Sequence, residues 1–422
     1  MNVYLVGGAV RDKLLNLPVK DRDWVVVGAD PQELLQQGYQ SVGKDFPVFL
    51  HPDTHEEYAL ARIERKTGAG YTGFECHFGK EVTLEEDLSR RDLTINAMAE
   101  DDQGKIIDPY GGQKDLQEQV LRHVSNAFVE DPLRVLRVAR FLARYHHLGF
   151  RVADETMALM QRIADSGELE SLTPERVWVE TEKALTEPSP WRYFEILRQC
   201  RALAAVFPEL DTLFGVPQPP KHHPEIDTGV HVMMTLQAAL QLMKDQDTAP
   251  NKEQRVAILF SLLCHDLGKG LTPPETLPSH PGHEDISDFL SKKVCKRLRA
   301  PNPVKRLSSL VARYHTHCHR AFELKPSTVM RLLEALDLMR RPETLEPFLL
   351  ACEADAKGRT GFENREYNQA DYLRDCAQAA KQVQAKELVN LGYKGETLGI
   401  ELRKRRIDAI RSMKKSYLKD SE

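Results

Sequence analysis

Residues 3–28 read VYLVGGAVRDKLLNLPVKDRDWVVVG. The apolar runs VYLV and DWVVVG predict two short β-strands, and the Gly-Gly pair between them predicts a tight turn. Further strand-like runs, FPVFL, EYALARI and KIIDPYGG, alternate with helical stretches up to about residue 112. We therefore expect a small α/β domain at this end of the chain and an almost wholly helical remainder.

The chain length of 422 residues is compatible with two to four domains. Proline and glycine cluster at residues 187–190, 215–224 and 272–282. Such clusters interrupt helices, so we expect boundaries near residues 190, 220 and 330.

The net charge of -5 does not by itself indicate a phosphate-rich partner. Any nucleic-acid contact must therefore come from local basic patches. Residues 401–419 carry eight Lys or Arg against two acids, and they form either such a patch or a solvated helical face.

The seven cysteines are dispersed, odd in number and never spaced as Cys-x-x-Cys, which argues against a disulfide framework and a structural zinc site. The first apolar stretch is too short for a signal peptide and has no basic region before it, and no run of 18 apolar residues occurs. We expect a soluble protein of the cytoplasm that makes no membrane contact.

Asp21 and Asp23 stand two residues apart at the start of the DRDWVVV segment. Side chains alternate along a strand, so both carboxylates are predicted to point to one face. A pair of carboxylates together with substrate phosphates supplies the oxygen ligands that Mg²⁺ prefers. We expect a catalytic Mg²⁺ site here, although an isolated Asp-x-Asp pair is more often a solvated turn.

A phosphate-binding motif precedes these carboxylates. Gly7 and Gly8 let the backbone approach an anion, and Arg11 is long enough to reach a triphosphate, whereas an isolated Gly-Gly pair is usually a turn. This motif, the Asp-x-Asp pair and RRDLTINAMA at residues 90–99 follow one another in the order typical of the nucleotidyltransferase superfamily. The chain thus resembles the group that contains bacterial CCA-adding enzymes and bacterial poly(A) polymerases.

By this resemblance, three residues of the motifs bind the incoming nucleotide: Gly8, Arg11 and Arg91. Asp92 and Asn96 are implied contacts to the sugar or to the local structure, and Asp92 is also compatible with the N-cap of a helix that runs to Ala99. RKTGAGYTGF at residues 65–74 resembles the flexible loop with which these enzymes switch to adding A. A plain surface loop is the alternative.

The segment EDPLRVLRVARFLARY at residues 130–145 predicts a helix that Asp131 caps and that has Pro132 in its first turn. Four arginines fall within an arc of about 120° on this helix: Arg134, Arg137, Arg140 and Arg144. Apolar residues, among them Phe141 and Tyr145, are expected on the opposite side. An ordinary amphipathic helix with a solvated basic face is the alternative.

CCA-adding enzymes of the bacterial and eukaryotic class carry a Glu-Asp-x-x-Arg motif, whose Asp and Arg serve as a protein template for the incoming base. The resemblance carries these roles to Asp131 and Arg134, and it implies that Arg137 and Arg140 bind the phosphates of the same nucleotide. A and C both present an amino donor beside a ring-nitrogen acceptor, whereas G and U present a carbonyl beside an N–H. A carboxylate next to a guanidinium therefore accepts A and C and rejects G and U.

The second half of the chain contains an ordered series of histidines and carboxylates. They are His231, His265, Asp266, His283, Glu284, His315, His317, His319 and Asp355. Such ligands can hold one or two divalent transition ions, although an isolated histidine is more often structural. The adjacent His265 and Asp266, followed by Gly268 and Lys269, resemble the HD superfamily of metal-dependent phosphohydrolases.

The HD resemblance implies a site for a divalent transition metal such as Ni²⁺. One ion would be held by His231, His265, Asp266 and Asp355. His283 and His315 would serve a second ion or the substrate phosphate. The implied substrates are 2′,3′-cyclic phosphates, 2′-phosphates and small phosphoesters at damaged tRNA ends, and an inactive HD scaffold is the alternative.

The two resemblances together cover nearly the whole chain and match class II CCA-adding enzymes with an HD domain. They imply an α+β fold with a polymerase-β-like nucleotidyltransferase head, a helical neck, an HD domain and a helical tail, at residues 1–125, 126–220, 228–329 and 330–422. The expected activity is untemplated addition and repair of CCA at the tRNA 3′ end from CTP and ATP, by a monomer or homodimer. The alternatives are a poly(A) polymerase and an HD phosphohydrolase whose head only binds RNA, and CTP incorporation would distinguish them.

Overall fold

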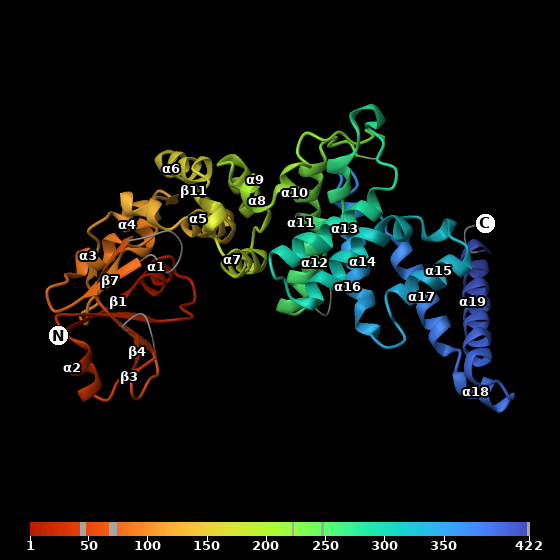
Figure 1. Cartoon of the computed structure of the whole chain (residues 1–422), viewed down its shortest axis with the longest axis horizontal. Coiled ribbons are helices and arrows are strands. Elements are labelled where there is room, and N and C mark those ends of the chain that lie inside the picture. The colour runs from red at the N-terminus through yellow and green to blue at the C-terminus, as the bar shows by residue number, and fades with distance from the viewer. Residues whose placement is uncertain (43–47, 67–73, 222, 246–248, 420–422) are drawn as a thin grey trace. The chain divides into compact units, whose positions relative to one another are not determined.

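The computed structural model describes residues 1–42, 48–66, 74–221, 223–245 and 249–419 (Figure 1). The chain forms two compact units, Met1–Val206 and Phe207–Glu422. None of the described helices is long and apolar enough to cross a membrane.

A seven-stranded mixed sheet is the centre of the first unit. Its order is β3 (Gln40–Ser41), β4 (Val48–Leu50), β5 (Glu57–Leu60), β2 (Asp23–Val27), β1 (Asn2–Val6), β8 (Ala99–Glu100) and β9 (Ile106–Ile107). Only the pairing of β2 with β5 is parallel, and the other neighbours are antiparallel. All five strand-like runs of the sequence contain strands, but EYALARI divides at Ala61 between β5 and β6 (Arg62–Lys66), which pairs with β7 (Phe74–Phe78) in a separate two-stranded sheet.

Both faces of the central strand β2 are buried. Val25 faces a cluster with Val6 and Leu88, whereas Val26 faces a second cluster with Leu34 and Phe49. Because neighbouring side chains on a strand point to opposite faces, the VVV run packs against two cores, and each buried valine contributes roughly 1.5–3 kcal/mol. This double burial makes β2 a rigid base for the exposed aspartates at its start.

The helices of the head are short. They are α1 (Gly8–Leu14), α2 (Pro31–Gln36), α3 (Leu84–Ser89) and α4 (Gly112–Gln117). A capping box starts α2 at Asp30 and another starts α3 at Thr83, and in each the third residue of the helix returns a hydrogen bond to the cap. These caps define where the chain leaves the sheet.

The rest of the first unit is helical. It contains α5 (Leu133–Tyr145), α6 (Asp154–Asp165), α7 (Pro174–Thr186), α8 (Trp191–Gln199) and α9 (Ala202–Val206), with a parallel bridge of β10 (Val120–Leu121) and β11 (Arg151–Val152). Helix α5 packs against α7 and α8, where Tyr145, Tyr193 and Phe194 are fully buried. This packing fixes the arginine-rich helix α5 within the unit.

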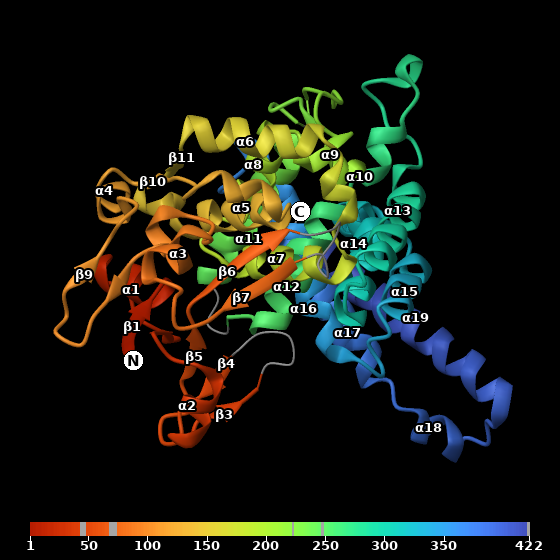
Figure 2. The same cartoon turned by 60° about the vertical axis from the view of Figure 1, so that its left-hand side comes forward.

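The second unit consists of helices in its described residues, apart from an isolated bridge between Pro217 and Asp227. Its helices are α10 (Pro208–Asp211), α11 (Thr228–Asp245), α12 (Lys252–Cys264), α13 (His283–Arg297), α14 (Asn302–His319), α15 (Pro326–Ala335), α16 (Leu345–Lys357), α17 (Asn368–Gln382), α18 (Ala385–Asn390) and α19 (Gly395–Lys419). Helix α12 is buried on all sides from Val256 to Cys264 and contacts α11, α13, α14 and α16. Helices α17 and α19 lie side by side (Figure 2). The expected α+β class, with a mixed sheet first and helices after it, is confirmed.

Candidate functional sites

The two aspartates of the DRD segment lie at the start of β2. Asp23 is the first residue of the strand, opposite Val6 of β1 and Glu57 of β5, and Asp21 precedes the strand. Both side chains are exposed. The pKa of the Asp23 carboxyl is raised above its ordinary value, mainly because the surrounding protein partly removes it from water. Arg91 opposes this shift, and the nearby Asp21 adds to it. A cation bound between the two carboxylates would relieve their repulsion.

Of the two glycines, only Gly7 has a position at which a larger residue would not fit. Its φ is +68°, and a Cβ at this position would stand 2.7 Å from a terminal nitrogen of Arg91. Its N–H donates to the Met98 carbonyl at 3.2 Å. Gly8, which the resemblance assigns to the nucleotide, begins α1 and has room for a Cβ at 3.4 Å from Arg11.

Arg91 is close to both Gly7 and Asp23. Its terminal nitrogens donate to the Asn96 carbonyl at 3.4 Å and to Asp87 Oδ2 at 3.3 Å. Its Nε is buried and has no hydrogen-bond partner among the described residues. An unsatisfied guanidinium N–H beside the paired aspartates suits an anionic ligand.

Arg11 is buried among protein groups. Its Nε donates to Asp12 Oδ1 at 2.9 Å, it also bonds the Asn96 side chain, and its guanidinium lies 5.3 Å from the ring centroids of both Phe141 and Tyr145. Contact between Arg11 and a triphosphate stays a prediction. Asp12 follows Arg11 in the sequence motif but had no expected role, and its carboxylate also accepts from Arg144 at 2.9 Å and from the Tyr145 hydroxyl at 3.0 Å.

Asp92 joins the RRD segment to helix α5. Its Oδ2 lies 2.7 Å from Arg137, and its Oδ1 accepts from the Asn96 amide at 2.9 Å. Burial by itself would raise the pKa of Asp92, but Arg137 and Asn96 hold it well below its usual range. The expectation of a helix to Ala99 is wrong, because only a 3-10 turn forms at Thr94–Asn96, and strand β8, which pairs with β1, already begins at Ala99.

The arginine face of α5 is not a solvated face. Arg134 and Arg140 are 8% exposed, and all four arginines bind protein groups. Arg134 donates to the carbonyls of Ala127 and Arg90, Arg137 pairs with Asp92, Arg140 with Glu180 and Arg144 with Asp12. The expectation that Phe141 lies opposite them is also wrong. Four residues after Arg137, it shares their face, and its ring centroid is 4.5 Å from the Arg140 guanidinium.

Asp131 and Arg134 are held by different partners. Asp131 has an extended backbone and Pro132 after it already has helical angles, so the bond that Asp131 Oδ1 accepts from the Leu133 N–H at 3.0 Å caps the start of α5. Its Oδ2 pairs with Arg176 at 2.8 Å. Arg134 is directed to the backbone carbonyls of Ala127 and Arg90 at 3.0 and 2.6 Å. The residue that sequence reasoning missed here is Arg176, which lies in α7, and its spacing from Asp131 carried no signal. The predicted flexible loop at residues 65–74 lies mostly outside the described residues, which resume at Phe74.

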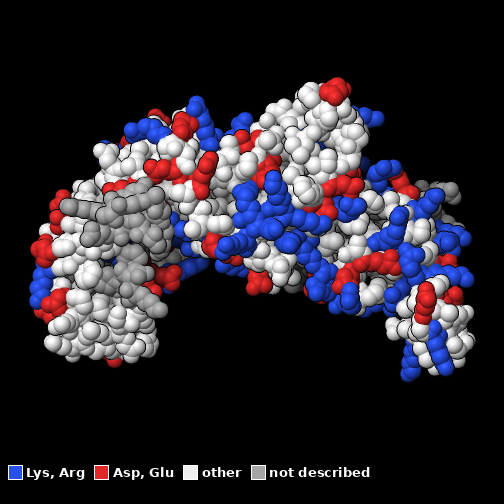
Figure 3. Space-filling model, in the orientation of Figure 1, with Lys and Arg blue, Asp and Glu red and all other residues white. Residues whose placement is uncertain are grey.

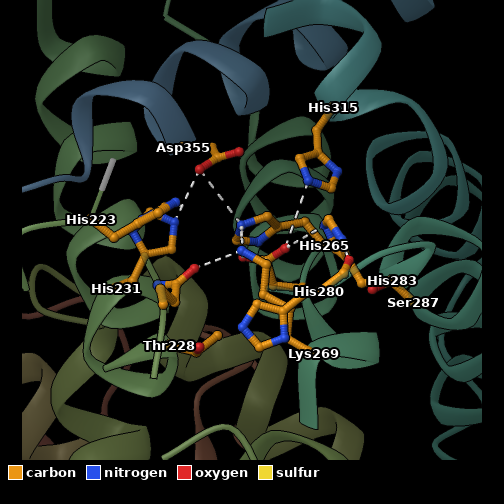
Figure 4. Close-up of polar contacts among 12 residues, drawn as sticks. His223, Thr228, His231, His265, Lys269, His280, His283, Ser287, His315 and Asp355 are labelled. Carbon is orange, nitrogen blue, oxygen red and sulfur yellow. Dashed lines mark hydrogen bonds and ion pairs between the residues drawn. The ribbon is translucent and has the colours of Figure 1, made fainter. Parts of the chain in front are cut away.

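A histidine cluster lies inside the second unit (Figure 4). His231 of α11 approaches Asp355 of α16, with Nε2 and Oδ1 3.0 Å apart. His265, which follows α12, has its Nε2 3.7 Å from the same Asp355 oxygen. The three side chains are buried, and their ligand atoms lie within 4.8 Å of one another. Tertiary packing therefore brings together residues that are 124 positions apart.

A second group of candidate ligands, Asp266, His283 and His315, adjoins the first group through the contact of Asp266 with His265. Asp266 Oδ2 lies 3.2 Å from His265 Nε2, and Oδ1 lies 3.3 Å from His283 Nε2 and 3.7 Å from His315 Nε2. All six predicted HD residues thus converge in this unit. Asp355 lies beyond residue 329, where we expected the HD domain to end.

The charges of this cluster are strongly coupled. Burial by itself would raise the pKa of Asp266, but His265 and Lys269 lower it well below its usual range. Burial also lowers the pKa of His265, but Asp266 and Asp355 outweigh it and raise this pKa. Burial holds the pKa of His315 well below its usual range.

The donor set fits a divalent transition ion. His265 Nε2, Asp266 Oδ1 and His283 Nε2 are buried and form no well-aligned hydrogen bond with the described residues, although the two imidazoles lie 3.2 and 3.3 Å from the Asp266 carboxylate. Buried polar atoms rarely stay unsatisfied, and imidazole nitrogens with carboxylate oxygens are ligands of such ions. Backbone carbonyls contact the Nδ1 atoms of His265 and His283, an arrangement that directs Nε2 toward a metal.

Three residues that contact the cluster, Glu225, His223 and His319, had no role in the expected metal site. Glu225 Oε1 lies 2.9 Å from His223 Nδ1 and 3.1 Å from His231 Nδ1, and His319 Nε2 lies 2.7 Å from Asp355 Oδ2. The sequence KHHPE before His231 was the available signal for the first pair. A cavity of about 360 Å³ borders the cluster. Its walls include Gln218, Lys269, His280, Arg320 and Arg359.

Three family models match the chain. They are the poly A polymerase head domain at residues 3–122, the probable RNA and SrmB-binding site of polymerase A at residues 149–214, and the HD domain at residues 228–355. The chain is 58% identical over 417 residues to the multifunctional CCA protein of Thioalkalivibrio sulfidiphilus, a match that covers 99% of this chain and 100% of that protein.

Solved structures of CCA-adding enzymes share this fold at low sequence identity. An apo form II gives a TM-score of 0.66 at 20% identity and covers 100% of this chain and 92% of that one. A complex with ATP gives 0.66 at 21% identity and covers 97% and 86%. The Thermotoga maritima enzyme complexed with tRNA gives 0.62 at 20% identity and covers 100% and 92%.

Proposed function

Because the chain belongs to the family of multifunctional CCA proteins, we propose that its two candidate sites carry out two reactions on the same tRNA end. The family is shown by 58% identity over almost the full length of both chains. The chain is accordingly a CCA-adding nucleotidyltransferase with an HD domain, and both of its enzymatic parts depend on metal ions. The residue roles and the substrates of the HD domain are the proposal.

In the nucleotidyltransferase site, Asp21 and Asp23 hold Mg²⁺. When bound there, Mg²⁺ would neutralise charge on the triphosphate and activate the tRNA 3′-hydroxyl. Arg91, which pairs with Asp87 and lies against Gly7, binds the nucleotide through its guanidinium. Gly8 and Arg11 complete the phosphate contacts.

Asp131 and Arg134 select the base, CTP or ATP, through their carboxylate and guanidinium. Arg176 and the Leu133 N–H hold the Asp131 carboxylate in place while leaving it further acceptor positions. Arg137 and Arg140 bind the same nucleotide. Asp92 holds Arg137 in position and Glu180 holds Arg140. Since these arginines already have carboxylate partners, a phosphate would share them or displace those partners.

In the HD domain, His231, His265, Asp266 and Asp355 hold a divalent transition ion such as Ni²⁺, and His283 and His315 serve a second ion or the substrate phosphate. A bound ion would activate water against a phosphoester. The proposed substrates are 2′,3′-cyclic phosphates, 2′-phosphates and small phosphoesters. The observation that carries this proposal is the convergence, beside a cavity, of three buried ligand atoms that lack a well-aligned hydrogen bond.

The direct test supplies purified protein and Mg²⁺ with tRNA that lacks CCA and with CTP, ATP, UTP and GTP, singly and together. Ordered addition of C, C and A that then stops is the expected result. Addition of A alone would indicate a poly(A) polymerase, and no addition would leave only the HD activity. Hydrolysis of 2′,3′-cyclic AMP in the presence of Ni²⁺ tests the HD domain. If the HD domain is an inactive scaffold, the cyclic AMP is not hydrolysed.

Two further expectations belong to this proposal. All seven cysteines are free, as expected for a protein of the reducing cytoplasm. We propose a monomer or homodimer, which light scattering of the purified protein would distinguish.

A further inference from the structure

Residues 289–322 contain nine Lys or Arg and no Asp or Glu, in a chain that has 63 acids and 58 basic residues. This stretch covers the second half of α13, the turn at residues 298–301 and all of α14. Such a run of one sign is unusual for a chain with a net negative charge. It creates a local positive field that the overall charge conceals.

Exposed cations gather where α13 meets α14. They are Lys292, Lys293, Lys296, Arg299 and Lys305. The turn between the helices is tight, because the Ala300 N–H donates back to the Cys295 carbonyl at 2.9 Å and the Lys305 N–H donates to the Pro301 carbonyl at 3.1 Å. In the space-filling view, Lys and Arg side chains gather over the region that Figure 1 labels α11 and α12 (Figure 3).

Carboxylates neutralise only part of this basic turn. Lys292 pairs with Asp288 at 2.8 Å, but no ion pair joins Lys293, Lys296 or Lys305 to an acid within the described ranges of the chain. The apolar residues Val294, Cys295 and Val304 face the core. The three lysines therefore contribute charge at the surface without a role in packing.

The basic turn and the metal ligands occupy opposite ends of one helical hairpin. His283 begins α13 and His315 lies near the end of α14, whereas Lys296 and Lys305 flank the turn. Thirteen residues separate His283 from Lys296, which corresponds to about 20 Å along the helix. A helical strand advances about 3.4 Å per nucleotide in B-form DNA and less in A-form RNA, so this distance corresponds to roughly six or seven nucleotides.

We propose that the basic turn, Lys293, Lys296 and Lys305, binds the phosphate backbone of an RNA whose terminal phosphate enters the HD cavity. This inference rests on the proposed phosphohydrolase activity. The turn provides affinity for a polynucleotide and none for a mononucleotide, because a mononucleotide in the cavity cannot span the hairpin. The HD domain thereby prefers RNA ends over free small phosphoesters.

The test compares the triple variant Lys293→Ala, Lys296→Ala, Lys305→Ala with the full-length wild type. The substrates are an RNA that ends in a 2′,3′-cyclic phosphate and the small compound 2′,3′-cyclic AMP. We expect the KM for the RNA to rise at least about tenfold, with its dependence on salt reduced by about two in log–log slope, and hydrolysis of cyclic AMP to stay unchanged. The matched control replaces three exposed lysines elsewhere in the unit: Lys244, Lys252 and Lys381.

Equal KM values for RNA in the triple variant and the control would overturn the inference. If the wild type hydrolyses neither substrate, the proposed phosphohydrolase activity fails, and lysine acetylation footprinting still decides the RNA surface. Added tRNA should then lower acetylation of the three turn lysines at least threefold and leave Lys244 and Lys252 unaffected. Unchanged acetylation of the turn would refute RNA binding there.

Discussion

The two candidate metal sites place their carboxylates in opposite surroundings. Asp21 and Asp23 are exposed at the start of a strand, whereas Asp266 and Asp355 are 1% and 2% exposed in a helical core. An exposed carboxylate pair supplies only part of a coordination shell, so its ion is shared with the substrate. The buried cluster supplies imidazoles and carboxylates from α11, α13, α14, α16 and the residues that follow α12, so its ligand set is assembled before any substrate arrives.

The largest expected effect is a double dissociation of the two sites. Asp23→Ala should lower CCA addition at least about a thousandfold by removing charge stabilisation, and it should leave cyclic AMP hydrolysis unchanged. His265→Ala should do the reverse. Each variant is the other's control in parallel assays of both activities. If either change in a folded protein abolished both reactions, the two sites would not be independent.

Metal binding at the buried cluster should depend on pH with a defined sign. Asp266 and Asp355 raise the pKa of His265, and Asp266 raises that of His283, so each is protonated at higher pH than an ordinary histidine. An ion must displace these protons, so Ni²⁺ affinity should fall about tenfold per pH unit for each proton displaced as pH drops from 8.5 to 6. Calorimetry in buffers of different ionisation enthalpy measures the protons released.

The metal-free protein should show the opposite trend. A histidine whose pKa is raised by folding stabilises the folded state below its unfolded pKa, and this contribution is lost as pH rises through the folded pKa. Thermal unfolding with a chelator should therefore show the second unit losing stability as pH rises above about 6.5, the ordinary histidine pKa, while the Ni²⁺-loaded protein gains stability. If stability changed with pH in the same way with and without Ni²⁺, protons and the metal would not compete for these ligands.

Gly7→Ala should reduce nucleotide addition by about ten- to a hundredfold, because the new Cβ would displace Arg91 from its position. Gly28→Ala is the matched control. Gly28 has a similar φ of +75° but no atom within 4 Å of the added Cβ, so it measures the backbone strain of about 1–2 kcal/mol alone. Equal activity of the two variants would show that the approach of Arg91 to Gly7 is unimportant for transfer.

The smallest effect concerns Asp131, which both caps α5 and carries the proposed base selection. Asp131→Ala should weaken the preference for C and A over U and G about tenfold and cost roughly 1 kcal/mol of stability through the lost cap. Asp131→Asn keeps a capping oxygen for the Leu133 N–H but removes the carboxylate. Misincorporation assays with both variants separate the roles, since unchanged base preference in Asp131→Asn would leave Asp131 only as a cap.

Local patterns predicted most of the secondary structure and failed where tertiary pairing intervened. The strands around Asp23 and the helix that begins after Pro132 follow from period and capping chemistry. The segment after Asp92 was predicted as a helix, but β8 pairs with β1 and ends the 3-10 turn at Asn96. A partner 93 residues away cannot be inferred from the helical spacing of Asp92 and Asn96.

The partners of charged residues were the least predictable feature of the sites. The sequence placed four arginines on one face of α5 but left open whether water or protein covers that face. In the folded protein, three of these arginines form ion pairs with the carboxylates of Asp92, Glu180 and Asp12. These carboxylates come from the head and from α7, so no spacing along the chain connects them to α5.

The sequence by itself determined the order of elements, the positions of the DRD and HD motifs and the family, because these depend on local period and on the identity of neighbouring residues. Only the tertiary structure decided that Gly7 rather than Gly8 admits Arg91, that Arg176 holds Asp131, and that Asp266 stands between two groups of histidines. The physical reason is that burial and packing bring together side chains far apart in the chain. Their distances, and therefore their pKa values and ligand geometry, exist only in the folded molecule.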